Sequence, residues 1–123
     1  KAKQRLKEDD LFAFKTKIRG FMYDSLVRRK GYSKKCHSYE ILGCSYEEAW
    51  AHLKQTWLEN YGTEWDGEPY HIDHIVPLST ATTKEEVENL CNIENLQMLT
   101  PEDNMSKGDK LNWEMPKFKE EDC

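Results

Sequence analysis

His71, Asp73 and His74 lie within four residues, directly before an apolar run. Two asparagines, Asn95 and Asn104, follow later in the chain. A carboxylate and an amide oxygen, completed by water, suit a hard divalent ion such as Mg²⁺ or Mn²⁺. A neutral imidazole can take a proton from water. Together these residue types indicate metal-assisted hydrolysis of a phosphodiester bond, which is the chemistry of a nuclease.

The order of these residues predicts separate roles for neighbouring side chains. Asp73 and His74 are adjacent on a predicted strand, so one is expected to hold the metal, with Asn104, while the other faces the nucleophile. Lys107 follows Asn104 by three residues on a predicted helix, where it is placed to contact a phosphate; a solvated lysine is the alternative. His71 shares the strand face of Asp73 and is expected either near the metal or a phosphate, or as scaffold.

Charge is distributed unevenly along the 123 residues. Residues 1–35 carry 12 Lys/Arg against four Asp/Glu, a net charge of +8, and residues 36–123 carry six against 19, a net charge of -13. A basic arm can supply phosphate contacts even in a protein whose net charge is -5. We expect Arg28 and Arg29 of this arm to bind nucleic acid, with a solvated helix face as the alternative.

The N-terminal half is predicted to be helical. Apolar residues recur at three- and four-residue steps over residues 9–30, and Gly31 is expected to end this helix. Ser38 is expected to cap a single helical turn. Ser45 begins a longer helix, because Glu48 stands at the capping-box position. These helices are expected to support the candidate site.

The C-terminal half is predicted to hold two short strands and two helices. Residues 70–76 alternate as a strand does, and residues 96–99 form a second strand. Thr82 or Thr83 caps a short acidic helix between them. Thr100, followed by proline, is expected to start the last helix. This order brings the polar residues of the first strand opposite Asn104 of the last helix.

Four cysteines occur without any C-x-x-C pairing, at positions Cys36, Cys44, Cys91 and Cys123. Cys36, His37 and Cys44 are potential zinc ligands, but no matching pair follows, so no structural zinc is expected. No segment has the apolar length of a membrane span or a signal sequence, so we expect a soluble, unexported protein without a membrane partner. The cysteines are therefore expected to be reduced thiols, with Cys44 and Cys91 half-buried.

The segments HIDHIVPL, NLQML and DNMSKG, within residues 71–107, resemble the HNH (ββα-metal) nuclease motif. The resemblance implies His74 as general base and Asp73 and Asn104 as ligands of one divalent ion. It implies that Asn95 braces the loop and orients the base. The expected reaction is hydrolysis of double-stranded DNA to 5′-phosphate and 3′-hydroxyl ends. Many family members have His in place of Asn104 and carry zinc-binding Cys pairs, which this sequence lacks.

The preceding residues, LGCSYEEAWAHLKQTW through ENYG, are similar to small HNH proteins of bacteriophages and mobile elements. This similarity implies the cytoplasm of a bacterial host cell and a phage terminase as a possible partner. The alternative is a non-catalytic DNA-binding or assembly accessory of a DNA-packaging machine. We predict one α+β domain, residues 1–123, with N-terminal helices packed on a ββα-metal finger. Its expected parts are a basic helical arm, a helical support, the finger and an acidic tail, at 1–35, 36–69, 70–108 and 109–123.

Overall fold

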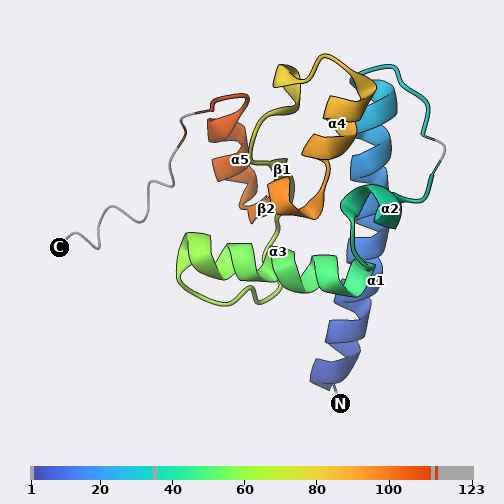
Figure 1. Cartoon of the computed structure of the whole chain (residues 1–123). Helices are drawn as coiled ribbons and strands as arrows, with labels where there is room; N and C mark the ends of the chain where they lie inside the picture. Colours follow the sequence, from blue (N-terminus) through green and yellow to red (C-terminus); the bar gives the residue numbers. More distant parts are fainter. Residues whose placement is uncertain (1, 35, 112, 114–123) are drawn as a thin grey trace.

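The computed structural model describes residues 2–34, 36–111 and 113 (Figure 1). Helices surround a two-stranded antiparallel sheet formed by β1 (His71–His74) and β2 (Leu96–Leu99). The predicted α+β class is therefore confirmed. Most of the predicted acidic tail lies outside the described residues.

The N-terminal helix is longer than the predicted 9–30 and changes its winding near its end. Helix α1 (Ala2–Tyr23) continues into η1 (Asp24–Arg28), a single π-helical stretch. A π-turn places one extra residue in the helix, and such turns recur at functional sites. Within η1, Ser25 and Leu26 are both buried. Gly31 then ends the segment with a φ of +79°, which glycine adopts without steric cost.

Two further helices follow in the first half. The single-turn helix α2 (Ser38–Leu42) begins one residue earlier than predicted, with His37 at the N-cap position. The predicted cap at Ser38 is therefore wrong: its hydroxyl is buried and has no hydrogen-bond partner among the described residues. Helix α3 (Tyr46–Tyr61) begins as predicted, with reciprocal hydrogen bonds between Ser45 and Glu48 at 3.0 Å each.

The second half follows the predicted order of strands and helices. Its remaining elements are η2 (Leu78–Thr80), α4 (Lys84–Leu90), η3 (Ile93–Asn95) and α5 (Pro101–Lys107). Thr83 caps α4 and Thr100 caps α5, each through its side-chain oxygen. Strand β1 is shorter than the predicted 70–76: it covers His71–His74, and each of these four residues pairs with one residue of β2.

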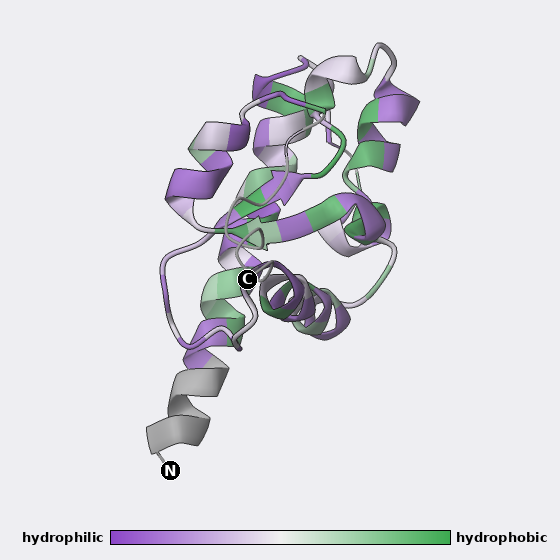
Figure 2. Cartoon of the chain, turned by 90° about the vertical axis from the view of Figure 1, so that its left-hand side faces the viewer, coloured by the Kyte–Doolittle hydropathy of each residue, from purple (hydrophilic) through white to green (hydrophobic). Residues whose placement is uncertain are grey.

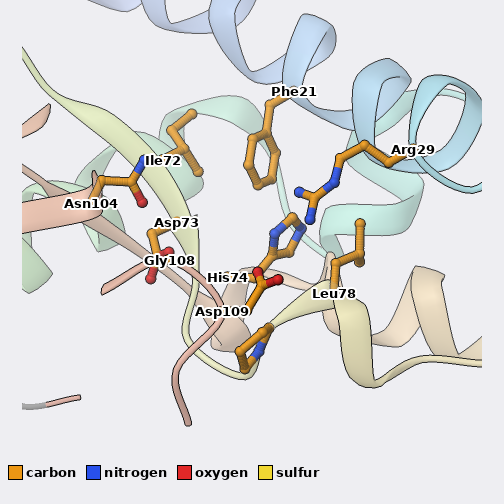
Figure 3. Close-up of a pocket in the computed structure, with 10 residues that line it drawn as sticks. Phe21, Arg29, Ile72, Asp73, His74, Leu78, Asn104, Gly108 and Asp109 are labelled. Atoms are coloured by element: carbon orange, nitrogen blue, oxygen red, sulfur yellow. The ribbon is translucent and has the colours of Figure 1, made fainter. Parts of the chain in front are cut away.

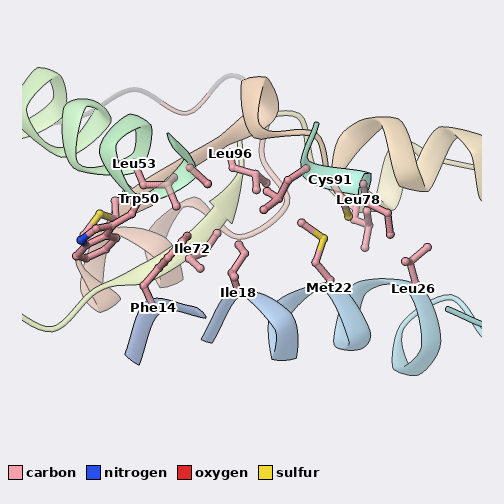
Figure 4. Packing of buried hydrophobic residues seen from close by; sticks show 14 of the residues in the cluster. Phe14, Ile18, Met22, Leu26, Trp50, Leu53, Ile72, Leu78, Cys91 and Leu96 are labelled. Atoms are coloured by element: carbon pink, nitrogen blue, oxygen red, sulfur yellow. The ribbon is translucent and has the colours of Figure 1, made fainter. Parts of the chain in front are cut away.

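One apolar cluster joins α1 to the sheet and to α3. Figure 4 shows side chains projecting from α1 toward the strands and α3, and Figure 2 shows that the helices carry both hydrophilic and hydrophobic residues. The fully buried members on this side of the cluster are Phe14, Ile18, Met22 and Leu26. The predicted basic arm therefore also contributes to the hydrophobic core, because the apolar side of α1 packs against the strands that carry the candidate site.

Candidate active site

The two strands hold the first half of the candidate site in register. Asp73 lies opposite Gln97, and His71 lies opposite Leu99. A residue of α3 holds the start of α5: the Tyr61 hydroxyl accepts a hydrogen bond from the Thr100 backbone N–H at 2.9 Å. These contacts anchor the start of α5 beside β1 and bring the end of that helix against the sheet.

Asp73 is held by a chain of hydrogen bonds that begins on α3. Asn60 donates to Gln97 Oε1 at 3.1 Å, and Gln97 Nε2 donates to Asp73 Oδ2 at 2.9 Å. The Lys107 ammonium lies 3.3 Å from the same oxygen. Burial raises the pKa of Asp73 above its ordinary value, although the Gln97 hydrogen bond and the charge of Lys107 oppose this shift. The other oxygen, Oδ1, has no hydrogen-bond partner among the described residues.

Lys107 does not lie where the sequence led us to expect it. Only 3% of the residue is exposed, and its ammonium donates to the His74 carbonyl at 2.9 Å in addition to pairing with Asp73. A phosphate contact would require Lys107 to leave both partners. In this structure its ammonium joins α5 to the end of β1, and the solvated alternative is wrong.

Asn104 and His71 contact each other directly. The Asn104 Nδ2 atom lies 2.9 Å from His71 Nδ1, so the amide donates to the imidazole when His71 carries its proton on Nε2. This bond fixes the amide and leaves its oxygen on the side facing Asp73, as Figure 3 shows. His71 therefore holds a predicted metal ligand in place, which agrees with the scaffold alternative for this residue.

Asn95 braces the loop that follows β1. Its side chain accepts from the Val76 N–H at 2.9 Å and donates to the carbonyls of Val76 and Leu90 at 3.2 and 2.8 Å. Its own carbonyl accepts from the Ile75 N–H at 2.7 Å. These are the contacts expected of a loop brace, and they fix the chain immediately after His74.

The His74 imidazole is enclosed between α1 and α4. Its ring stacks on Phe21 with centroids 4.6 Å apart, and its Nε2 atom lies 3.5 Å from both Ser25 Oγ and Cys91 Sγ. Burial lowers the pKa of His74 to about 3, and the positive charges of Arg29 and Lys107 act in the same direction. The imidazole is therefore neutral at physiological pH, as a proton acceptor must be.

Several residues around His74 were not predicted as part of the site. Phe21 and Ser25 lie four residues apart on α1 and η1. Arg29, which was predicted only as a nucleic-acid contact, follows η1 after another four residues, and the close-up in Figure 3 shows the Arg29 and Phe21 side chains directed toward His74. The four-residue step was visible in the sequence, but it could not reveal which segment this face covers. Cys91 was predicted to be half-buried and is fully buried against the imidazole, with burial raising its pKa to about 11.

Asp73, His74 and Asn104 line one pocket of about 200 Å³, with Arg29 and Asp109 at its walls (Figure 3). A larger groove of about 620 Å³ adjoins it and shares Arg29 and Asn104. The sequence prediction is thus correct that β1 and α5 bring these three side chains together.

The groove also has a cationic lining. Its basic residues are Lys17, Arg28 and Arg29, and Asp24 is its one carboxylate. Arg28 lies over the Tyr23 ring at 5.9 Å, and Lys17 donates to the Tyr70 carbonyl at 2.6 Å. Arg28 and Arg29 are both exposed, so their side chains are accessible to an anionic ligand. Lys17 was not predicted as part of this surface.

Two further observations concern the described part of the chain as a whole. It contains no group of three or more His, Cys, Asp or Glu side chains arranged to hold a metal ion. None of its helices combines the length and the apolar character that a membrane crossing needs.

Comparison with known proteins finds a similar viral protein. The chain is 32% identical over 112 residues to an uncharacterised protein of Acanthamoeba polyphaga mimivirus. The match covers 89% of this chain and 48% of that protein, so the chain spans about half the length of the curated relative it matches. No protein-family model matches the sequence, and no solved structure matches it significantly.

Proposed function

We propose that this protein is a metal-dependent DNA endonuclease in which β1, β2 and α5 form a ββα-metal finger of the HNH type. The observation that carries the proposal is the shared pocket of Asp73, His74 and Asn104, because it joins a carboxylate, a neutral imidazole and an amide oxygen. The motif resemblance of residues 71–107 supports the same reaction. The products are 5′-phosphate and 3′-hydroxyl ends.

In this proposal His74 is the general base. The lowered pKa of His74 keeps the ring neutral throughout the physiological range, so its lone pair is free to accept a proton from water, but the same shift makes it a weaker base than a solvent-exposed histidine. Asn95 contributes by holding the backbone after His74, through its hydrogen bonds to Val76 and Leu90. Its role is positioning, since its amide is already engaged by three backbone groups.

The donors present fit one hard divalent ion, Mg²⁺ or Mn²⁺. Asp73 offers Oδ1, and Asn104 offers its amide oxygen, while Gln97 and His71 orient the two side chains from behind. Bound there, the ion would supply Lewis acidity and stabilise the leaving 3′ oxygen. Because Lys107 already pairs with Asp73, which is the one carboxylate among the two proposed ligands, a substrate phosphate would strengthen ion binding.

Double-stranded DNA is the proposed substrate. The groove beside the pocket carries Lys17, Arg28 and Arg29, so a phosphodiester backbone lying in it would lead into the pocket. The basic N-terminal helix would extend these contacts along the backbone, with the finger against the minor groove. Phosphate contacts of this kind position the nucleic acid and predict binding that weakens as salt increases.

A second candidate, a non-catalytic DNA-binding module, is favoured by the burial of the same residues. Asp73 and His74 are 7% and 5% exposed, and Lys107 ties both to α5. An ion pair of this kind can serve a purely structural role in a scaffold. A scaffold has no use, however, for a carboxylate and an amide oxygen that face a pocket beside a neutral imidazole. Cleavage therefore separates the two candidates.

The test is incubation of supercoiled plasmid with the protein in Mg²⁺, in Mn²⁺ and in EDTA. The nuclease proposal predicts nicked or linear plasmid with either metal and none in EDTA. Ligation of the products by DNA ligase would establish 5′-phosphate ends. Salt-sensitive DNA binding without cleavage in any metal would instead support the binding module.

A further inference from the structure

Ser25, which lies outside the motif-bearing segment, contacts the proposed base. Its hydroxyl oxygen lies 3.5 Å from His74 Nε2, and Ser25 is 1% exposed. The His74 ring stacks on Phe21 with centroids 4.6 Å apart, which restricts the plane of the imidazole beside this contact. By contrast, His74 Nδ1 has no hydrogen-bond partner among the described residues.

The protons of this cluster can be assigned from its hydrogen bonds. Ser25 Oγ, in η1, donates its single proton to the carbonyl of Phe21, near the end of α1, at 2.8 Å. Toward His74 the hydroxyl can therefore only accept. A neutral imidazole with its lone pair on Nε2 would face another lone pair in a buried site. The 3.5 Å contact is long for a hydrogen bond, but it becomes attractive once Nε2 carries the proton.

The thiol of Cys91 does not reverse this assignment. Its sulfur lies 3.5 Å from the same Nε2 atom and also contacts Ser25. A thiol is a weak donor and a weak acceptor, so it adapts to the proton already present on the imidazole. Ser25 has no such freedom, because its proton is committed to the Phe21 carbonyl.

We propose that Ser25 is a positioning residue that keeps the proton of His74 on Nε2, so that the lone pair on Nδ1 is the one available to take a proton from water. The assignment of the proton follows from the contacts alone, whereas its use in catalysis rests on the proposed nuclease function. The N-terminal helix thus contributes to the chemistry as well as to DNA binding.

The direct test is nitrogen-15 NMR of the His74 ring in the full chain at neutral pH. The wild type is expected to give one protonated and one unprotonated nitrogen, with the proton on Nε2. Ser25→Ala is expected to shift this pattern toward exchange between the two tautomers. Cys91→Ala is the matched control, because it removes the other contact of Nε2, and it is expected to leave the wild-type pattern unchanged.

Two results would overturn the proposal. One is a wild-type spectrum with the proton on Nδ1, which decides the matter even if Ser25→Ala unfolds. The other is a folded Ser25→Ala protein, with a wild-type thermal transition, whose tautomer is unaltered. If the wild type cleaves DNA, Ser25→Ala should lower kcat about 10- to 100-fold with little change in KM, as loss of an orienting partner does. Absence of cleavage would refute the nuclease proposal, and the NMR spectra would still show whether Ser25 determines the tautomer of His74.

Discussion

The burial of His74 predicts that the protein loses stability on mild acidification. Burial lowers the pKa of His74 from 6.5 to about 3, with Arg29 and Lys107 contributing. Between these two values the unfolded chain binds a proton that the folded protein excludes. The free energy of unfolding must therefore fall as pH falls from about 6.5 toward 3, and the full contribution of neutral His74 is present only above this window.

The size of the effect follows from the width of the window. Each pKa unit corresponds to about 1.4 kcal/mol, so lowering the pH from 7 to 4 removes about 3 kcal/mol through His74 alone. Asp73 acts in the opposite direction, because its raised pKa lets the folded protein take up a proton and regain stability in acid. The free energy of unfolding of the wild type therefore changes less between pH 7 and pH 4 than His74 alone would make it change.

Urea unfolding of the wild type and of His74→Gln at pH 7 and pH 4 isolates this contribution. The contribution of Asp73 is common to both proteins and largely cancels in the comparison. The wild type should lose about 3 kcal/mol more than the variant between the two pH values. His37→Gln, a change at an exposed histidine, should behave as the wild type does. An equal loss in the wild type and His74→Gln would refute the burial argument.

Three further predictions concern the surroundings of the site. Lys107→Met leaves Asp73 buried without its cation, so urea unfolding at pH 7 should show a free energy of unfolding about 3–5 kcal/mol lower than that of the wild type. This difference should shrink in acid. A variant as stable as the wild type would contradict the buried ion pair. Asn95→Ala removes three side-chain hydrogen bonds that hold the loop after β1, and it should lower the free energy of unfolding by about 1–3 kcal/mol. It should also speed hydrogen exchange of the Val76 amide, and unchanged exchange there would show that Asn95 does not brace the loop. Arg29→Ala should weaken DNA binding measured by fluorescence anisotropy and reduce the salt slope by about one. Arg19→Ala, a change within α1 and outside the pocket and groove, should have a smaller effect. Equal effects of the two substitutions would contradict the groove as the DNA path.

Local features of the fold could be predicted because their causes lie within a few residues. The capping box of Ser45 and Glu48 and the Thr100 cap followed by proline are both observed where the sequence placed them. Ser38 shows the limit of such reasoning. A serine before an apolar turn has the composition of a cap, but the helix begins at Ser38 itself, and His37 occupies the cap position.

The surroundings of the site could not be predicted, because they depend on which face meets which across the fold. Lys107 has the polarity of a surface residue, and only the docking of α5 on β1 brings its ammonium to Asp73. Ser25 fits the apolar stripe of α1 as a small residue. Its contact with His74, 49 residues away, arises from the packing of α1 on the sheet and from the π-turn in η1.

Whether His74 performs a chemical step on DNA can be measured as the rate of DNA cleavage under single-turnover conditions. Labelled duplex DNA would be incubated with excess wild-type protein, His74→Ala or His37→Ala in Mg²⁺ and in Mn²⁺. If His74 is the general base, the wild type and His37→Ala will cleave the duplex, and folded His74→Ala will cleave it at a rate at least about 100-fold lower. Cleavage by His74→Ala at the wild-type rate would show that His74 is not the base.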